Sequence, residues 1–163
     1  MKKIFFVIAI IISLSVNAQV TKVSLQASGL TCSMCSNAIN KALKTIDFVD
    51  KIEPNIKTSN FDITFKPGSK IDFDKLKNKV EDAGFFVSRF IATVRFDNVQ
   101  IKPGEPVAIG DKTFQFVNFK DQVLNGDKAL RIIDKGFLSA KEYKKNAAAF
   151  GDVKGTKIYH VVI

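Results

Sequence analysis

Hydrophobic and polar positions in the first half of this chain follow two different periods. Alternating or continuous apolar stretches bounded by turn residues predict strands over 20–27, 49–56, 61–65 and 86–96. Apolar residues at three- and four-residue steps predict helices over 38–46 and 73–83, the second with Asp72 as its N-cap and Gly84 as its stop. Pro54 cannot donate a ladder hydrogen bond, so it favours an edge position for the second strand. This order of elements is that of a ferredoxin-like βαββαβ domain, with both helices on one face of an antiparallel sheet.

The second half of the chain, from about Asp97, shows a different pattern. Short strand candidates at 99–101, 107–109, 113–119 and 130–133 are separated by Pro, Gly, Asn and Asp. A helix is expected over 139–150 with Ser139 as its N-cap, followed by a last strand over 157–163. We interpret this half as a small β-rich module with one helix. The predicted fold class is therefore α+β, with a ferredoxin-like domain at 20–94 and a C-terminal module at 97–163 whose role the pattern does not indicate.

The first 18 residues have the pattern of a secretory signal peptide rather than of the fold. Lys2 and Lys3 form a basic start, residues 4–12 are apolar, and the small residue Ala18 suits cleavage by signal peptidase. An uncleaved membrane anchor is the alternative, but the apolar run is shorter than the ~20 residues that a spanning helix needs. We therefore expect a protein that is periplasmic or otherwise secreted after cleavage near Ala18.

The charge of the chain does not point to nucleic acid. Loss of Lys2 and Lys3 lowers the formal net charge from +9 to +7, and the remaining lysines are scattered without a basic run of five or more. In an exported protein this balance favours solubility, attraction to anionic lipid or sugar, or an acidic partner over nucleic-acid binding.

The two cysteines of the chain are Cys32 and Cys35, three positions apart and just ahead of the first helical pattern. Two thiols at this spacing can share a soft metal ion, cycle through a disulfide or form a structural bridge. A bridge between them would close almost no loop, which makes the structural role the weakest of the three. Thiolates are soft ligands that select Cu(I) and Hg(II), and the N–H groups at the start of a helix favour the thiolate form.

Two motifs of the first half match one known family. Gly29, Thr31, Cys32 and Cys35 fit the pattern Gly-Met-Thr-Cys-x-x-Cys, and residues 81–85 fit an acidic-Ala-Gly-aromatic run at the end of the second helix. With the element order between them, residues 20–94 resemble the heavy-metal-associated domain of copper-transporting ATPases, copper chaperones and periplasmic mercury-binding proteins.

The resemblance implies a function and a set of partners. It implies that Cys32 and Cys35 bind Cu(I), or Hg(II) or another soft ion, and pass it by ligand exchange to or from a donor or acceptor protein such as a membrane transporter. Leu30 replaces the family's Met, which packs beneath the loop and is not normally a ligand, and Leu is close to it in volume. Phe85 falls where family members carry a residue near the metal, so it either shields the site or simply belongs to the core.

Other functions remain as alternatives to metal trafficking or buffering. A thiol–disulfide oxidoreductase would use the same cysteines, but Thr31, Ser33 and Met34 are not typical of redox motifs, and we expect no enzyme. A module that binds an envelope partner is a third hypothesis. Structural zinc needs four protein ligands, and besides the cysteines the chain offers only His160, which we expect to be an ordinary surface or half-buried residue. We expect Met34 to face solvent rather than to be a ligand.

Overall fold

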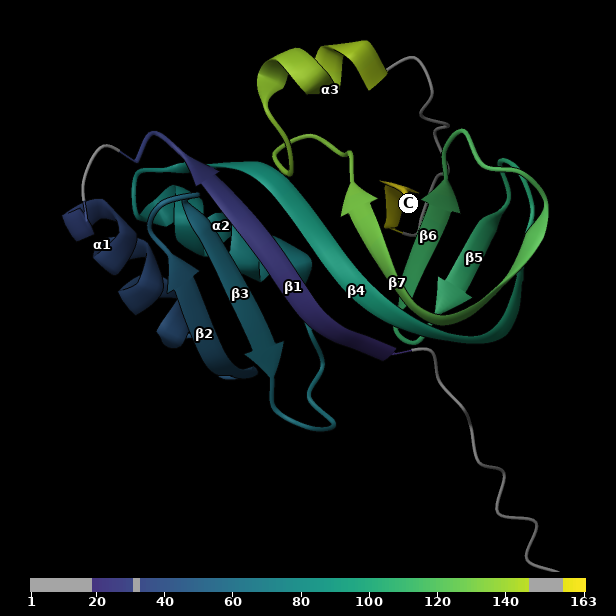
Figure 1. The fold of residues 1–163 in the computed structure, drawn as a ribbon, viewed down its shortest axis with the longest axis horizontal. Helices are drawn as coiled ribbons and strands as arrows, with labels where there is room; N and C mark the ends of the chain where they lie inside the picture. Colours follow the sequence, from purple (N-terminus) through teal and green to yellow (C-terminus); the bar gives the residue numbers. More distant parts are fainter. Residues whose placement is uncertain (1–18, 31–32, 147–156) are drawn as a thin grey trace, which may run out of the picture.

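The structure, a computed structural model, describes residues 19–30, 33–146 and 157–163 (Figure 1). The first half contains β1 (Gln19–Ser28), α1 (Ser33–Lys44), β2 (Val49–Asn55), β3 (Asn60–Phe65), α2 (Phe73–Asp82) and β4 (Phe86–Ile101). The second half contains β5 (Pro106–Ile109), β6 (Lys112–Phe116), β7 (Gln122–Ile132), α3 (Ala140–Asn146) and β8 (Ile158–Val162). The α+β class and the βαββαβ order followed by a β-rich region with one helix are therefore confirmed. The predicted signal peptide lies outside the described residues.

The described strands form a single eight-stranded sheet in the order β2-β3-β1-β4-β7-β8-β6-β5. All neighbouring pairs in it are antiparallel except β6 and β8, which run parallel. The β2–β3 hairpin is present, and β2 lies at an edge, as the position of Pro54 predicts. The first four strands give the ferredoxin-like arrangement, and β4 carries the sheet onward into the second half (Figure 1).

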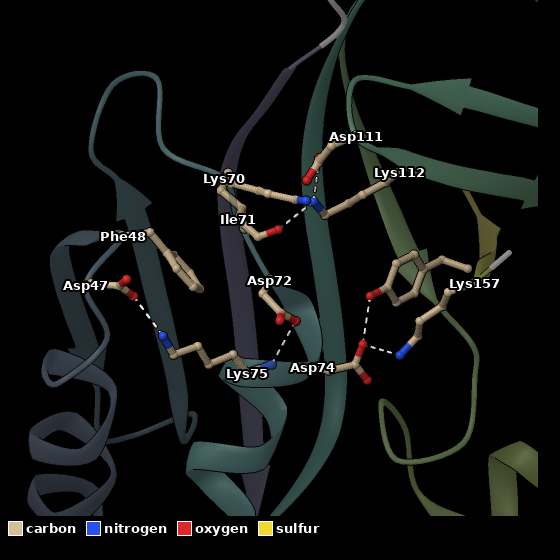
Figure 2. A pocket seen from close by; sticks show the side chains of 11 residues that line it. Asp47, Phe48, Lys70, Ile71, Asp72, Asp74, Lys75, Asp111, Lys112 and Lys157 are labelled. Atoms are coloured by element: carbon tan, nitrogen blue, oxygen red, sulfur yellow. Dashed lines mark hydrogen bonds and ion pairs between the residues drawn. The ribbon is translucent and has the colours of Figure 1, made fainter.

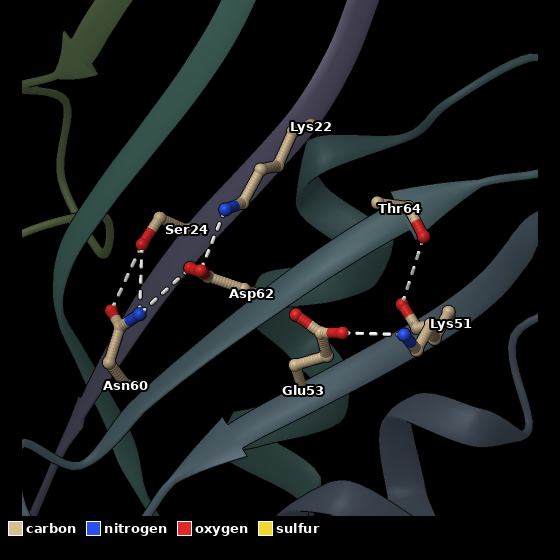
Figure 3. A network of polar contacts seen from close by, with 7 residues as sticks. All are labelled: Lys22, Ser24, Lys51, Glu53, Asn60, Asp62 and Thr64. Carbon is tan, nitrogen blue, oxygen red and sulfur yellow. Dashed lines mark hydrogen bonds and ion pairs between the residues drawn. The ribbon is translucent and has the colours of Figure 1, made fainter.

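The two faces of the first four strands have different chemistry. Val23 and Leu25 of β1 are fully buried, and they share one core with Ile39 of α1 and Leu76 of α2. The alternate positions on β1 and β3 carry a polar network on the other face, shown in Figure 3. Two of its bonds cross between the strands: Lys22 Nζ donates to Asp62 Oδ2 at 2.7 Å, and Asn60 Nδ2 donates to Ser24 Oγ at 2.9 Å. Within β3, Asn60 Nδ2 also donates to Asp62 Oδ1 at 2.9 Å. This alternation is why the sequence pattern predicts these strands so directly.

The strand β4 is longer than the sequence pattern predicts. It continues through Asp97 and Asn98 to Ile101, and its register with β7 shifts between Phe96 and Val99. Asn98 has a positive φ of 49°, so the pair of turn-forming residues makes a bulge rather than an end to the strand. The expected separate strand at 99–101 is therefore the last part of β4. The division of the chain at 94–97 stays a prediction.

The expected strand at 130–133 is only the end of β7, which begins at Gln122. The sequence hides the rest of β7 because Asn125, Gly126 and Asp127 are typical of turns and are exposed. In the structure Gly126 has a φ of +72° and lies opposite Phe96, next to the bulge in β4. The glycine thus accommodates a local irregularity inside a strand pair.

The capping predictions are confirmed. Asp72 accepts a hydrogen bond from the Lys75 N–H at 3.0 Å at the start of α2. At α3, Ser139 Oγ accepts from the Glu142 N–H at 3.4 Å and donates to the Glu142 carboxylate at 3.1 Å, a reciprocal cap. The expected extension of this helix over 147–150 lies outside the described residues.

Both halves of the chain share one core and a polar seam above it. Phe73, the first residue of α2, contacts Phe90 of β4 at 5.2 Å between ring centroids and Tyr159 of β8 at 5.2 Å. Figure 2 shows the seam, where Lys75 pairs with Asp47, and Lys157 with Asp74. In each of these two pairs the charge of the lysine is balanced by that of its carboxylate partner.

Candidate metal site

The segment that leads to the cysteines leaves the end of β1. The last residues of β1 are fixed on both sides, because the Ala27 N–H donates to the Ser59 carbonyl at 3.0 Å and Ser28 Oγ donates to the Phe86 carbonyl at 3.3 Å. Gly29 then takes a φ of +85°, in the left-handed region that glycine adopts without strain. Leu30 packs against the main core, as expected for the residue that replaces the family's Met.

Cys35 lies on the first turn of α1, which begins at Ser33. The side chain of Cys35 is half-buried, that of Ser36 is buried, and that of Met34 is 80% exposed. The helix thus begins at residue 33, before the predicted start at 38, because the apolar period that marks the helix begins only later. The exposure of Met34 confirms that its side chain faces solvent. Thr31 and Cys32 lie outside the described residues.

The surroundings of Cys35 favour a thiolate in two ways. The first N–H groups of a helix have no intrahelical partner and carry the positive end of its dipole, which stabilises an anion there. The first turn of α1 also contains no acidic residue. Cys32 precedes the first residue of α1 by one position in the sequence. Two thiolates, from Cys32 and Cys35, would form a donor set that suits a soft metal ion.

Phe85 lies beside the start of the cysteine loop. A Cβ atom added to Gly29 would lie 3.9 Å from Phe85 Cδ1, and Phe85 itself is half-buried against the main core. The turn after α2 directs it there, because Gly84 has a φ of +86° and the Phe85 N–H donates to the Val80 carbonyl at 3.1 Å. Phe85 therefore packs in the core next to Gly29. Its role as a shield of the metal site stays a prediction.

Sequence reasoning missed the apolar residues exposed at this end of the molecule. Phe86 is 69% exposed and Ile56 is 59% exposed. A signal was available for Phe86, because successive residues of a strand point to opposite faces and the pair Phe85–Phe86 cannot both enter the core. Ile56 lines a small cavity of about 140 Å³ with Ser33 and Ser36 of α1. The start of α1 therefore adjoins exposed apolar surface.

His160 lies away from this site, in β8. Its Nδ1 is 2.7 Å from Asp134 Oδ1, and its backbone N–H donates to Asp134 Oδ2 at 2.8 Å. Burial raises the pKa of Asp134 above its usual value, although the contacts with His160 oppose this shift. His160 is buried and does not lie on the surface. The sequence pattern could not show this, because its partner Asp134 is distant in the sequence and follows the neighbouring strand. Within the described ranges, no group of three or more His, Cys, Asp or Glu side chains could hold a metal ion.

Comparison with known proteins identifies the family. Residues 24–86 match the model of the heavy-metal-associated domain. The mercuric transport protein periplasmic component of Serratia marcescens is 34% identical over 86 residues, which cover 52% of this chain and 93% of that protein. The copper-exporting P-type ATPase of Staphylococcus saprophyticus is 38% identical over 61 residues, which are 37% of this chain but only 8% of the ATPase.

Solved structures also match. The yeast copper transporter domain Ccc2a is 31% identical, with 41% of this chain and 90% of that chain covered and a TM-score of 0.37. Oxidized MerP from Ralstonia metallidurans is 30% identical, with 43% and 96% covered and a TM-score of 0.39.

A βαββαβ fold with a Cys-x-x-Cys motif at the start of its first helix defines a class of small heavy-metal-binding proteins. The chain belongs to the heavy-metal-associated domain family. In the part of the chain that the structure describes, no helix has the length and apolar character needed to cross a membrane.

Proposed function

We propose that this chain is an exported soft-metal-binding protein that binds Cu(I) through Cys32 and Cys35 and carries or buffers the ion. The observation that carries the proposal is the position of Cys35 on the first turn of α1. Cys35 follows Cys32 by three positions in the sequence, and both cysteines lie inside the matched region 24–86. A two-thiolate site suits Cu(I), which accepts low coordination, and it leaves room for a third thiol from a partner. The ion would then move by exchange of ligands.

Hg(II) is the second candidate cargo. The relative from Serratia marcescens, which this chain covers over 93% of its length, is a mercuric transport protein. Hg(II) shares the preference of Cu(I) for soft thiolates, so the same two cysteines would serve either ion. Export is supported by the basic start, the apolar run and the small residue Ala18, and the same relative is a periplasmic component.

The proposed partners are a metal donor and a metal acceptor, one of which can be a membrane transporter. Support comes from the match to a segment of a copper-exporting ATPase and to a domain of the yeast copper transporter. In an oxidising compartment the two thiols can also pair with each other, which would stop metal binding. We therefore propose that the metal-binding state needs a reductant or prior loading with the ion.

Titration of the reduced chain from Gln19 with Cu(I) against a competing chelator tests this function. We expect one ion per chain, with binding lost after oxidation and restored by reduction. The double variant Cys32→Ser, Cys35→Ser should bind roughly a hundredfold more weakly or not at all, because it removes both soft donors. Met34→Leu, which removes a thioether but leaves both thiols, is the matched control and should bind as the parent does.

Parallel titrations with Hg(II) and Zn(II) rank the cargo ions. Equal Cu(I) binding by the double cysteine variant and the parent would contradict the proposed site. Weak binding of all three ions, together with disulfide-reductase activity, would instead favour the oxidoreductase hypothesis.

A further inference from the structure

An apolar groove lies beside the site, and the heavy-metal-associated region does not form it alone. It has a volume of about 650 Å³ and lies between the start of β4, the segment after β7, and α3. Figure 1 shows α3 outside the sheet, next to the end of β7. The apolar walls come from both halves of the chain: Phe86, Val87, Leu138, Ala140 and Tyr143.

The packing around the groove keeps its walls in place. Leu138 is buried in a small cluster with Val117 and Ile133, against which Tyr143 packs. Gly136 lies against α2, since a Cβ atom at this position would be 3.0 Å from Lys77 Cδ. The segment after β7 is thus held between α2 and the sheet, and the groove is a preformed feature of the fold.

The charges lining the groove are unequal. Lys135 and Lys144 line it and are exposed, and neither makes an ion pair within the described ranges. The one carboxylate in the lining, Glu81, lies 3.7 Å from the Lys77 ammonium and is neutralised by it. An apolar cavity lined by two cations without a counter-charge complements a ligand that is apolar along its length and anionic at one end.

We propose that this groove binds a free straight-chain carboxylate, that is, a fatty acid. The chain lies against Phe86, Leu138 and Tyr143, and the carboxylate meets Lys135 or Lys144. The volume falls within the range of about 300–1,000 Å³ that is usual for small-molecule sites. Residues 135–144 lie beyond the matched region 24–86, so the proposal gives the C-terminal half a binding role that is separate from metal binding.

Calorimetric titration of the chain from Gln19 with decanoate, far below its micelle concentration, tests the proposal. We expect saturable binding to one site, and octanoate should bind about tenfold more weakly because it buries two fewer methylene groups. Ala140→Trp fills the groove from an exposed position and should abolish binding of decanoate. Cu(I) binding by this variant should equal that of the parent, and an unchanged circular dichroism spectrum shows that the variant is folded.

The neutral alcohol decan-1-ol separates the apolar contacts from the charge. The double variant Lys135→Met, Lys144→Met should bind decanoate about tenfold or more weakly, since it loses charge-assisted contacts, yet bind decanol as the parent does. Lys120→Met, an exposed lysine that does not line the groove, is the matched control and should leave both ligands unaffected.

Three results would overturn the proposal. They are the absence of saturable decanoate binding, unchanged binding by Ala140→Trp, and binding only to vesicles of phosphatidylglycerol. The last result would mean a membrane surface rather than a free carboxylate. The metal proposal is independent of all three, because it rests on the cysteines.

Discussion

Gly29 turns the chain immediately after β1. Its φ of +85° lies in the region where a side chain clashes with the backbone, and β1 is fixed just before it by the contacts of Ala27 and Ser28. A residue with a Cβ would find space, since the nearest atom, Phe85 Cδ1, would be 3.9 Å away. Glycine is therefore favoured at this position because of its backbone conformation, and not because a side chain would clash with Phe85.

We expect Gly29→Ala to lower the free energy of unfolding by about 1 kcal/mol, the usual cost of a left-handed alanine. Gly29→Asn is the matched comparison and should cost less, because asparagine tolerates this conformation better than other residues. Urea denaturation of both variants measures the difference. Equal destabilisation by the two would mean that the loss comes from contact with Phe85 rather than from the backbone.

Single residues also show how far the sequence could define this site. The motif around Cys35, the half-buried Leu30 and the cap Asp72 follow from local patterns, and the structure agrees with the last two. The groove beside Phe86 did not follow, because its facing walls come from segments about fifty residues apart. Local periodicity contains no information on such pairs.

The long strand β4 joins the two predicted regions. It pairs with β1 on one side and with β7 on the other, and its last part follows the bulge at Asn98. Turn-forming residues at 97–98 and at 125–127 led the sequence pattern to end one strand early and to begin another late. Both groups are used inside the same strand pair, where a bulge and Gly126 meet. Turn propensity alone cannot separate a bulge from a loop, because both use positive φ angles.

We expect Asn98→Val to lower the free energy of unfolding by about 1–2 kcal/mol, since a β-branched residue is strained at a φ of 49°. Asn98→Gly removes the side chain but accepts the conformation, and it should stay close to the parent. Chemical denaturation of the three proteins provides the test. A valine variant as stable as the parent would show that the bulge can relax into regular pairing at no cost.

The two halves of the whole molecule share a core as well as a sheet. Phe73 at the start of α2 packs on Phe90 from one half, and on Phe114 and Tyr159 from the other. These residues belong to a single continuous cluster of buried side chains. The sequence predicted the first half well because a known motif order defines it. The join could not be predicted, since contacts between distant segments depend on the sheet order and not on local pattern.

A polar contact above this shared core gives the join a dependence on pH. Asp74 of α2 accepts hydrogen bonds from Tyr159 Oη at 2.8 Å and from Lys157 Nζ. Burial alone would raise the pKa of Asp74, but these two donors hold it below its usual value. Burial, and next the hydrogen bond to Asp74, raise the pKa of Tyr159 far above its usual value, so the phenol remains a donor across the neutral range.

We expect Asp74→Asn to lower the free energy of unfolding by about 1 kcal/mol at pH 7, a modest figure because the pair is partly exposed to solvent. The pKa of Asp74 is lower in the folded chain than in the unfolded chain, so the folded state binds fewer protons. The stabilisation is therefore complete above the unfolded value of about 3.8 and is lost as the pH falls through the folded value. The parent and the variant should thus become equally stable in acid.

Urea denaturation at pH 7 and at about pH 1.5 measures this difference, because the acid arm has to lie below the folded pKa of Asp74, which is itself lower than the unfolded pKa. Tyrosine fluorescence is a suitable probe, because Tyr143 and Tyr159 are the two tyrosines of the chain and both lie in its second half. Asp82→Asn, at an exposed position at the end of α2, is the control and should change little at either pH. A constant difference between Asp74→Asn and the parent at both pH values would show that the carboxylate acts by shape alone, whereas its disappearance in acid would assign the effect to the charge that ties α2 to β8.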